Sequence, residues 1–354
     1  MSTQPNYAVP TGDYVAEWMD DNGVIAAELG RRLGVSRKHV SELLSGKAPL
    51  SRGLAISLQE VTSIPARIWN QYEALYREDL ARIESDAAYA AQYEEAKAYP
   101  LAHLRKSGHI SAGARDRAGT VKQVLALFGV ASFDALRTTW SEGNVAYRRS
   151  VVTRQDAAAL QTWLALGERA AEQIDVAEFD KDALRAVLPD LRALSATNPA
   201  TYVAAAVTAL AGVGVSLCFE RPMPGLGIHG ATRWVGHHPV VQLSLLYKAD
   251  DQLWFTLFHE LGHVLLHGED VLYLTGENTS AEDEANTFAA DTLIPLAFVD
   301  RLPRDRDSGA IRALADELGI APGIVLGRAQ RETGDYAWGH SLKTHFDFAT
   351  GAEA

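Results

Sequence analysis

The segment from Gln252 to His267 is the feature that most constrains what this chain can fold into. It is apolar on almost every side of a helix, through Leu253, Trp254, Phe255, Leu257, Phe258, Leu261, Val264, Leu265 and Leu266. A helix with this pattern is buried in a protein core. It nevertheless carries His259, Glu260 and His263, and burying such groups costs several kcal/mol unless they are paired or bind a metal. The segment therefore predicts ionisable side chains with a chemical role inside a core.

The spacing of these side chains favours a metal site. Residues i and i+4 lie on one helix face, about 6 Å apart along the axis, so the imidazoles of His259 and His263 can bind one ion. Glu260 is placed to take a proton from water in the open coordination position. His267 lies about 12 Å beyond His259, which is too far for the same ion. We predict a catalytic Zn²⁺ site with Glu260 as general base; histidines satisfied by backbone carbonyls are the alternative.

A catalytic zinc site needs a third protein ligand from another segment. The stretch that begins at Ser280 offers Glu282, Asp283 and Glu284. Ser280 is a natural helix N-cap, and the helix dipole accounts for Glu282 and Asp283 in the first turn. Glu284 lies one turn before Phe288, on the side that faces inward if Phe288 is buried. Glu284 is therefore predicted to be the third ligand.

Two strings carry a resemblance to a known family. HELGHVLLH at 259–267, followed by EDEANTFAADTLIP at 282–295, is similar to the ImmA/IrrE family of bacterial metallopeptidases. The similarity spans roughly Val213 to Pro295 and also points to Glu284. It implies a zincin-like domain that cleaves a partner regulatory protein, commonly a repressor. The residue that stabilises the tetrahedral oxyanion stays open among His229, His237, His238, Tyr247 and Tyr273.

A strand is predicted directly before the metal-binding helix. Val241 to Leu245 alternates apolar and polar residues, which indicates a half-buried strand. Extended peptides commonly bind by pairing with an exposed sheet edge. We therefore expect this strand to form the edge of the cleft and to hold the substrate.

Near the N-terminus, small and apolar residues have the spacing of a helix-turn-helix, at Leu29, Gly30, Leu33, Gly34, Val35, Val40 and Leu43. Ala26 to Arg52 contains six lysines or arginines and two glutamates, a net charge of +4 in a chain of −12. This contrast supports contact with phosphates. Residues at the start of the second helix are predicted to contact DNA, namely Ser36, Arg37, Lys38 and Ser41. A helical bundle with a solvated basic face is the alternative.

A second resemblance covers about 24–76. The strings SGKAPL at 45–50 and IPARIW at 64–69 are similar to the HigA antitoxin branch of Xre-type regulators. The resemblance implies a double-stranded DNA operator as a partner. A palindromic operator would in turn imply a homodimer.

The chain of 354 residues is too long for one small core, so several domains are expected. We predict an α+β protein that is predominantly helical. Residues 1–76 form an all-α helix-turn-helix domain, 77–197 a helical connector, and 198–354 a zincin-like domain with a small sheet.

Cellular location follows from three further observations. Cys218 is the only cysteine, so no intramolecular disulfide can form, and a reducing compartment fits. Residues 1–14 lack the pattern of a signal peptide. Val203 to Phe219, the most apolar long stretch, changes from a helical to a strand-like pattern and does not suggest a membrane span. A cytoplasmic protein without a membrane partner is expected.

The sequence thus favours a DNA-binding regulator fused to a zinc metalloendopeptidase, whose protein substrate is a repressor or a toxin. One alternative is an antitoxin and autorepressor that binds a toxin and has an idle metal site. Another is a ligand-sensing transcription factor that uses the pocket around the metal. Glu260 favours the enzyme, because a structural metal site needs no general base.

Overall fold

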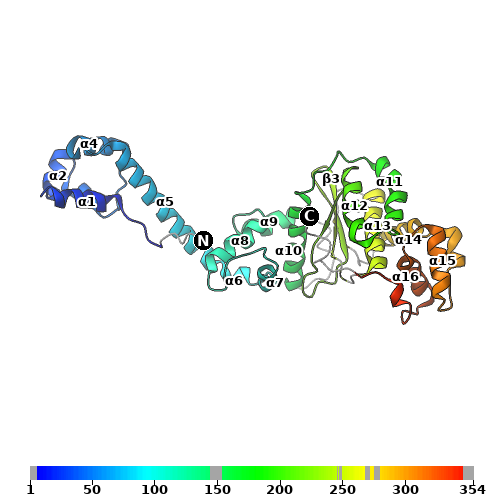
Figure 1. Cartoon of the computed structure of the whole chain (residues 1–354). Coiled ribbons are helices and arrows are strands. Elements are labelled where there is room, and N and C mark those ends of the chain that lie inside the picture. Colours follow the sequence, from blue (N-terminus) through cyan, green and yellow to red (C-terminus); the bar gives the residue numbers. More distant parts are fainter. Residues whose placement is uncertain are drawn as a thin grey trace. The chain divides into compact units, whose positions relative to one another are not determined.

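The computed structural model describes residues 6–143, 154–244, 246, 249–267, 272–274 and 280–345 (Figure 1). The chain forms two compact units. The first comprises Met1–Tyr93 and Ala112–Lys122, and the second comprises Glu94–Ser111 and Gln123–Ala354. The segment 77–197, set apart in the sequence as a connector, is divided between them.

The first unit is helical throughout its described part. Its main helices are α1 (Thr11–Asp21), α2 (Ala26–Leu33), α3 (Arg37–Leu44), α4 (Arg52–Thr62) and α5 (Ala66–Ala91). They enclose a core that includes Val15, Leu29, Val40, Leu43, Leu58 and Trp69. The helical spacing of these residues in the sequence explains why each short helix buries one face.

The second unit combines helices with one small sheet, and the chain as a whole is predominantly helical, as predicted. Before the sheet come α6 (Tyr93–Ala96), α7 (Leu101–Lys106), α8 (Arg117–Leu127), α9 (Phe133–Gly143), α10 (Arg154–Ala171), α11 (Lys181–Leu194) and α12 (Pro199–Ala211). The first part of α8, up to Lys122, belongs to the first unit. The strands are β1 (Ser216–Phe219), β2 (Gly230–Val235), β3 (His238–Leu243) and β4 (Tyr273–Leu274). The remaining helices are α13 (Asp250–Leu266), α14 (Ser280–Leu293), η2 (Leu296–Arg301), α15 (Ser308–Leu318), α16 (Pro322–Thr333) and η3 (His340–Leu342).

The sheet has the order β1-β3-β2-β4, with β1 parallel to β3 and the other pairs antiparallel. A two-residue turn at Gly236 and His237 joins β2 to β3. Gly236 has a φ of 61° there, a left-handed conformation that such tight hairpins require and that glycine adopts without strain.

The expectation that Val241 to Leu245 forms an edge strand is wrong. In the structure β3 lies between β1 and β2, and the Ser244 amide donates to the His229 carbonyl at 2.8 Å. Leu245 lies outside the described residues. Alternation shows which residues share a face of a strand, but it carries no information about the strand's neighbours. Even the polar residue Gln242 is buried, because its amide donates to the Trp163 carbonyl at 2.7 Å.

Helices cover both faces of the sheet: α10 packs on one face, and α12 and α13 pack on the other (Figure 1). Successive side chains of β2 therefore point to opposite faces of the sheet and contact different helices. Thr232 faces α13, whereas Arg233 faces α10. The core between the sheet and α13 includes Val241, Trp254, Phe258 and Leu261. No helix in the described part of the chain is long and apolar enough to cross a membrane.

Glu220, directly after β1, places a carboxyl group in a buried position. Its side chain is 14% exposed, and burial raises its pKa to about 7, although Arg221 acts to lower it. In the unfolded chain the pKa of this carboxyl group is about 4.5. The folded protein therefore holds the proton of the Glu220 carboxyl group more tightly than the unfolded chain does. The stability that this proton contributes is complete below about pH 4.5 and is lost as the pH rises through about 7.

Glu220→Gln, which cannot ionise, is expected to be more stable than the wild type by about 1–3 kcal/mol above pH 7. The difference should shrink towards zero near pH 4. Urea unfolding at a series of pH values measures it. Glu178→Gln, at an exposed position in the same unit, is the matched control and should change stability little at any pH. A difference for Glu220→Gln that is the same at every pH would contradict the assignment.

Candidate metal centre

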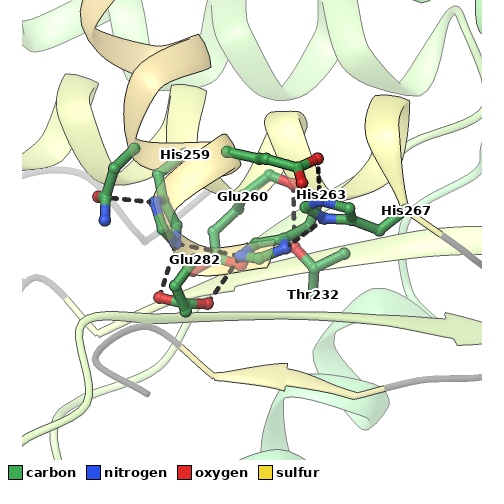
Figure 2. Close-up of polar contacts among 8 residues, drawn as sticks. Thr232, His259, Glu260, His263, His267 and Glu282 are labelled. Atoms are coloured by element: carbon green, nitrogen blue, oxygen red, sulfur yellow. Dashed lines mark hydrogen bonds and ion pairs between the residues drawn. The ribbon is translucent and has the colours of Figure 1, made fainter. Parts of the chain in front are cut away.

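Three buried side chains from two helices converge in the second unit. His259 and His263 come from α13, and Glu282 comes from the first turn of α14. Their ligand atoms all lie within 4.8 Å of one another. The two Nε2 atoms are 3.1 Å apart. Glu282 places Oε1 2.9 Å from Nε2 of His263 and Oε2 3.3 Å from Nε2 of His259 (Figure 2).

The donor set fits a divalent metal ion. Four ligands at 2.0–2.2 Å from a tetrahedral zinc lie about 3.3 to 3.5 Å from one another, close to the distances between these three groups. Burial lowers the pKa of the His263 imidazole, which favours the neutral ring that binds metal. Two imidazoles and one carboxylate are also the protein ligands of many catalytic zinc sites, in which one position stays open.

The two helices approach closely because their facing residues are small. A Cβ atom at Gly262 would lie 3.3 Å from the Ala285 Cα and 3.1 Å from a ring carbon of Phe288. Such distances are tighter than ordinary van der Waals contact. Gly262 and Ala285 therefore let α14 come near enough to α13 for a glutamate to reach both histidines.

The prediction that Glu284 completes the cluster is wrong, since Glu282 occupies that place. The buried face of α14 contains Glu282, Ala285, Ala289 and Leu293, which recur at helical spacing. Glu284 lies on another face: its side chain is 62% exposed, and its carboxylate is 3.5 Å from His267. Phe288 does pack against the edge of the core, where it is partly buried, but Glu284 one turn earlier points away from that core into solvent.

Further side chains orient the two histidines from outside the cluster. Nδ1 of His259 lies 3.1 Å from the Asn286 side-chain oxygen, and Nδ1 of His263 lies 2.8 Å from Nδ1 of His267 (Figure 2). The Tyr273 ring stacks on His263, with centroids 4.4 Å apart and planes 15° apart. Partners of this kind fix the ring orientation of metal-binding histidines. They agree with the prediction that His267 lies outside the set of ligands.

Glu260 is fully buried, and a side chain of the sheet holds its carboxylate in place. The Thr232 hydroxyl donates to Oε2 of Glu260 at 2.7 Å (Figure 2). Burial acts to lower the pKa of His259, but Glu282 and Glu260 outweigh it, so the net pKa is raised. The charge of Glu260 therefore acts on one of the two histidines of the cluster.

The sequence patterns did not predict the roles of Thr232 and Asn286 or the position of Glu282. Asn286 could have been found from its spacing, since it lies one turn after Glu282 on the same helix. Thr232 has no signal in the sequence, because it reaches Glu260 only through the packing of β2 on α13. Of the oxyanion candidates, Tyr273 packs on the cluster and Tyr247 lies outside the described residues.

The four residues predicted to contact DNA lie on exposed positions at α3, at Ser36, Arg37, Lys38 and Ser41. Ser36 caps the helix, since its hydroxyl accepts from the His39 amide at 3.1 Å. Lys38 lies 3.7 Å from Glu42. Arg37 makes no ion pair within the ranges that the structure describes.

The second unit combines a buried helix that carries two histidines one turn apart, a glutamate from a second helix, and a small sheet beside them. These features define a metallopeptidase-type domain. Residues 214–329 match the model of a peptidase family described as the IrrE N-terminal-like domain. The match begins just before β1, ends in α16 and lies within the second unit. A search of curated proteins finds no match for the chain.

Proposed function

We propose that this chain is a DNA-binding transcriptional regulator fused to a zinc metalloendopeptidase that cleaves a partner protein. The observation that carries the peptidase is the buried cluster of His259, His263 and Glu282 beside Glu260. A zinc ion held there would polarise a water molecule and the scissile carbonyl. The family match of residues 214–329 supports a peptidase of this class.

Glu260 supplies the acid–base chemistry of the proposed reaction. Its carboxylate takes a proton from the water that attacks the carbonyl carbon. It then delivers that proton to the departing amide nitrogen as the C–N bond breaks. The hydrogen bond from Thr232 holds one carboxylate oxygen in place. Burial excludes bulk water and strengthens these electrostatic interactions.

The peptidase proposal is tested with the full chain and Zn²⁺, incubated with the proteins encoded by its neighbouring genes. New termini detected by mass spectrometry would support proteolysis. A stoichiometric complex without cleavage would favour the antitoxin alternative. Neither cleavage nor a complex would favour the ligand-sensing alternative.

The DNA-binding half of the proposal rests on α2 and α3. Gly34 ends α2 with a left-handed φ of 67°, and a Cβ atom at Gly30 would lie 2.9 Å from the Val35 carbonyl oxygen. The close approach of the two helices and the exposed polar surface of the second helix support the proposal of a helix-turn-helix pair. Double-stranded DNA is the proposed partner, and a palindromic operator would be bound by a homodimer.

Arg37→Ala with Lys38→Ala is expected to weaken binding to the DNA upstream of the gene by about 10- to 100-fold, because two cationic contacts are lost. Zinc content should not change, since the metal centre lies in the other unit. A mobility-shift titration at fixed salt measures the affinity. The control is Lys181→Ala with Arg185→Ala, two exposed positions on α11 that change the net charge equally. If the two double variants bind the DNA equally well, the proposal that α3 contacts DNA is refuted.

A further inference from the structure

The second unit contains a cavity of about 480 Å³ away from the metal centre. Its apolar wall includes Leu127, Phe128, Leu136, Trp140, Leu164 and Leu272. This volume falls within the range of small-molecule sites, about 300–1,000 Å³, and the lining combines this apolar wall with polar and charged side chains. The cavity lies on the α10 side of the sheet, whereas Glu260 and the metal ligands lie on the α13 side.

Arg233 of β2 supplies the cationic group of this cavity. Its guanidinium donates to two neutral oxygens, the Gln242 side-chain oxygen at 3.0 Å and the Leu164 carbonyl at 2.7 Å. Its Nε is buried without a hydrogen-bond partner. No carboxylate of the described residues lies within ion-pair distance of it. Burial lowers the pKa of Arg233, yet arginine stays protonated in proteins.

A largely buried cation without an ion-paired carboxylate is costly, by several kcal/mol in a low-dielectric site, and the exposed carboxylate of Glu168 acts on Arg233 from beyond ion-pair distance. The other charged groups of the lining are Glu168, Arg169 and Glu172. All three are exposed, Glu168 and Arg169 on α10 and Glu172 directly after it, so water solvates them. Arg233 is thus the charged group that would gain most from an anion inside the cavity.

We propose that this cavity binds a small amphipathic carboxylic acid, with the carboxylate at Arg233 and an aromatic or aliphatic body against Phe128 and Trp140. One charge-assisted interaction would fix the orientation, and burial of the apolar body would supply most of the affinity. The bound acid would lie behind β2, one residue along the strand from Thr232. The site does not depend on zinc or on peptidase activity.

Naphthoate and its uncharged isostere naphthamide are suitable probes, because they differ in the group that would meet Arg233. Isothermal titration calorimetry on the full chain is expected to show naphthoate binding about 10- to 100-fold more tightly, as a charged hydrogen bond implies. Arg233→Met should abolish this preference. Arg328→Met is the matched control, since Arg328 lines a separate cavity of about 230 Å³ beside α16, and the preference should persist in it.

A second variant tests the site without touching Arg233. Thr139 lines the cavity and is exposed, so Thr139→Trp should fill the entrance, keep the fold and weaken both probes at least 10-fold. Unchanged naphthoate affinity in this variant would overturn the proposal, whether or not Arg233→Met folds. An equal affinity of the wild type for both probes would overturn the role of Arg233. Neither readout requires cleavage, so failure here is distinct from failure of the peptidase proposal.

Discussion

Glu260→Gln is expected to lower the rate of substrate cleavage by about 100- to 10,000-fold, the usual contribution of a general base. The amide cannot take a proton from the attacking water. It can still accept the hydrogen bond from Thr232, so the packing of α13 on β2 should survive. The two histidines and Glu282 remain, so zinc should stay bound at one equivalent. Cleavage rates and zinc content, measured on the same preparations, test both parts.

Glu284→Gln is the matched control for Glu260→Gln, because it makes the same chemical change on an exposed side chain. Its cleavage rate should stay close to that of the wild type. If Glu260→Gln cleaves as fast as the wild type, another group is the base. If Glu260→Gln loses zinc while Glu284→Gln keeps it, the lower cleavage rate would report on the metal and not on proton transfer.

Glu282→Ala is expected to weaken zinc binding by more than about 100-fold. Loss of an outer partner of a metal ligand already costs 10- to 100-fold, and Glu282 contacts both histidines directly. Glu284→Ala should retain nearly the wild-type affinity, since the Glu284 carboxylate lies beside His267 and outside the cluster of three ligands. Competition with a colorimetric chelator measures both affinities.

Circular dichroism of the metal-free proteins must accompany this comparison, because a misfolded variant would also lose zinc. The two alanine variants differ by two positions in the same helix, so they share any effect of helix propensity. Stronger zinc loss from folded Glu284→Ala than from folded Glu282→Ala would return the ligand role to Glu284.

The two proposed functions place a DNA-binding surface and a peptidase site in one chain. Arg37 and Lys38 lie in the first unit, and the metal centre lies in the second. Variants in one unit should therefore leave the other function intact, apart from effects on stability. This independence makes each half of the proposal testable by itself.

The sequence by itself determined the features that depend on one helix or one turn. His259 and His263 are four residues apart in a segment that is apolar all round, so helix geometry alone puts both imidazoles on one buried face. The short helices at α2 and α3 follow in the same way from apolar spacing and from Gly34 between them. A small sheet in a predominantly helical chain was likewise readable from local patterns.

Only the tertiary structure decided which distant groups meet. Three consecutive acids near the start of α14 have similar local chemistry, and the packing of Ala285 on Gly262 selects Glu282. The interior position of β3 and the bond from Thr232 to Glu260 depend on strand order and on the layer above the sheet. The physical reason is that helical and strand periodicity specify which side chains share a face. The partner of that face is specified by packing between elements far apart in the sequence.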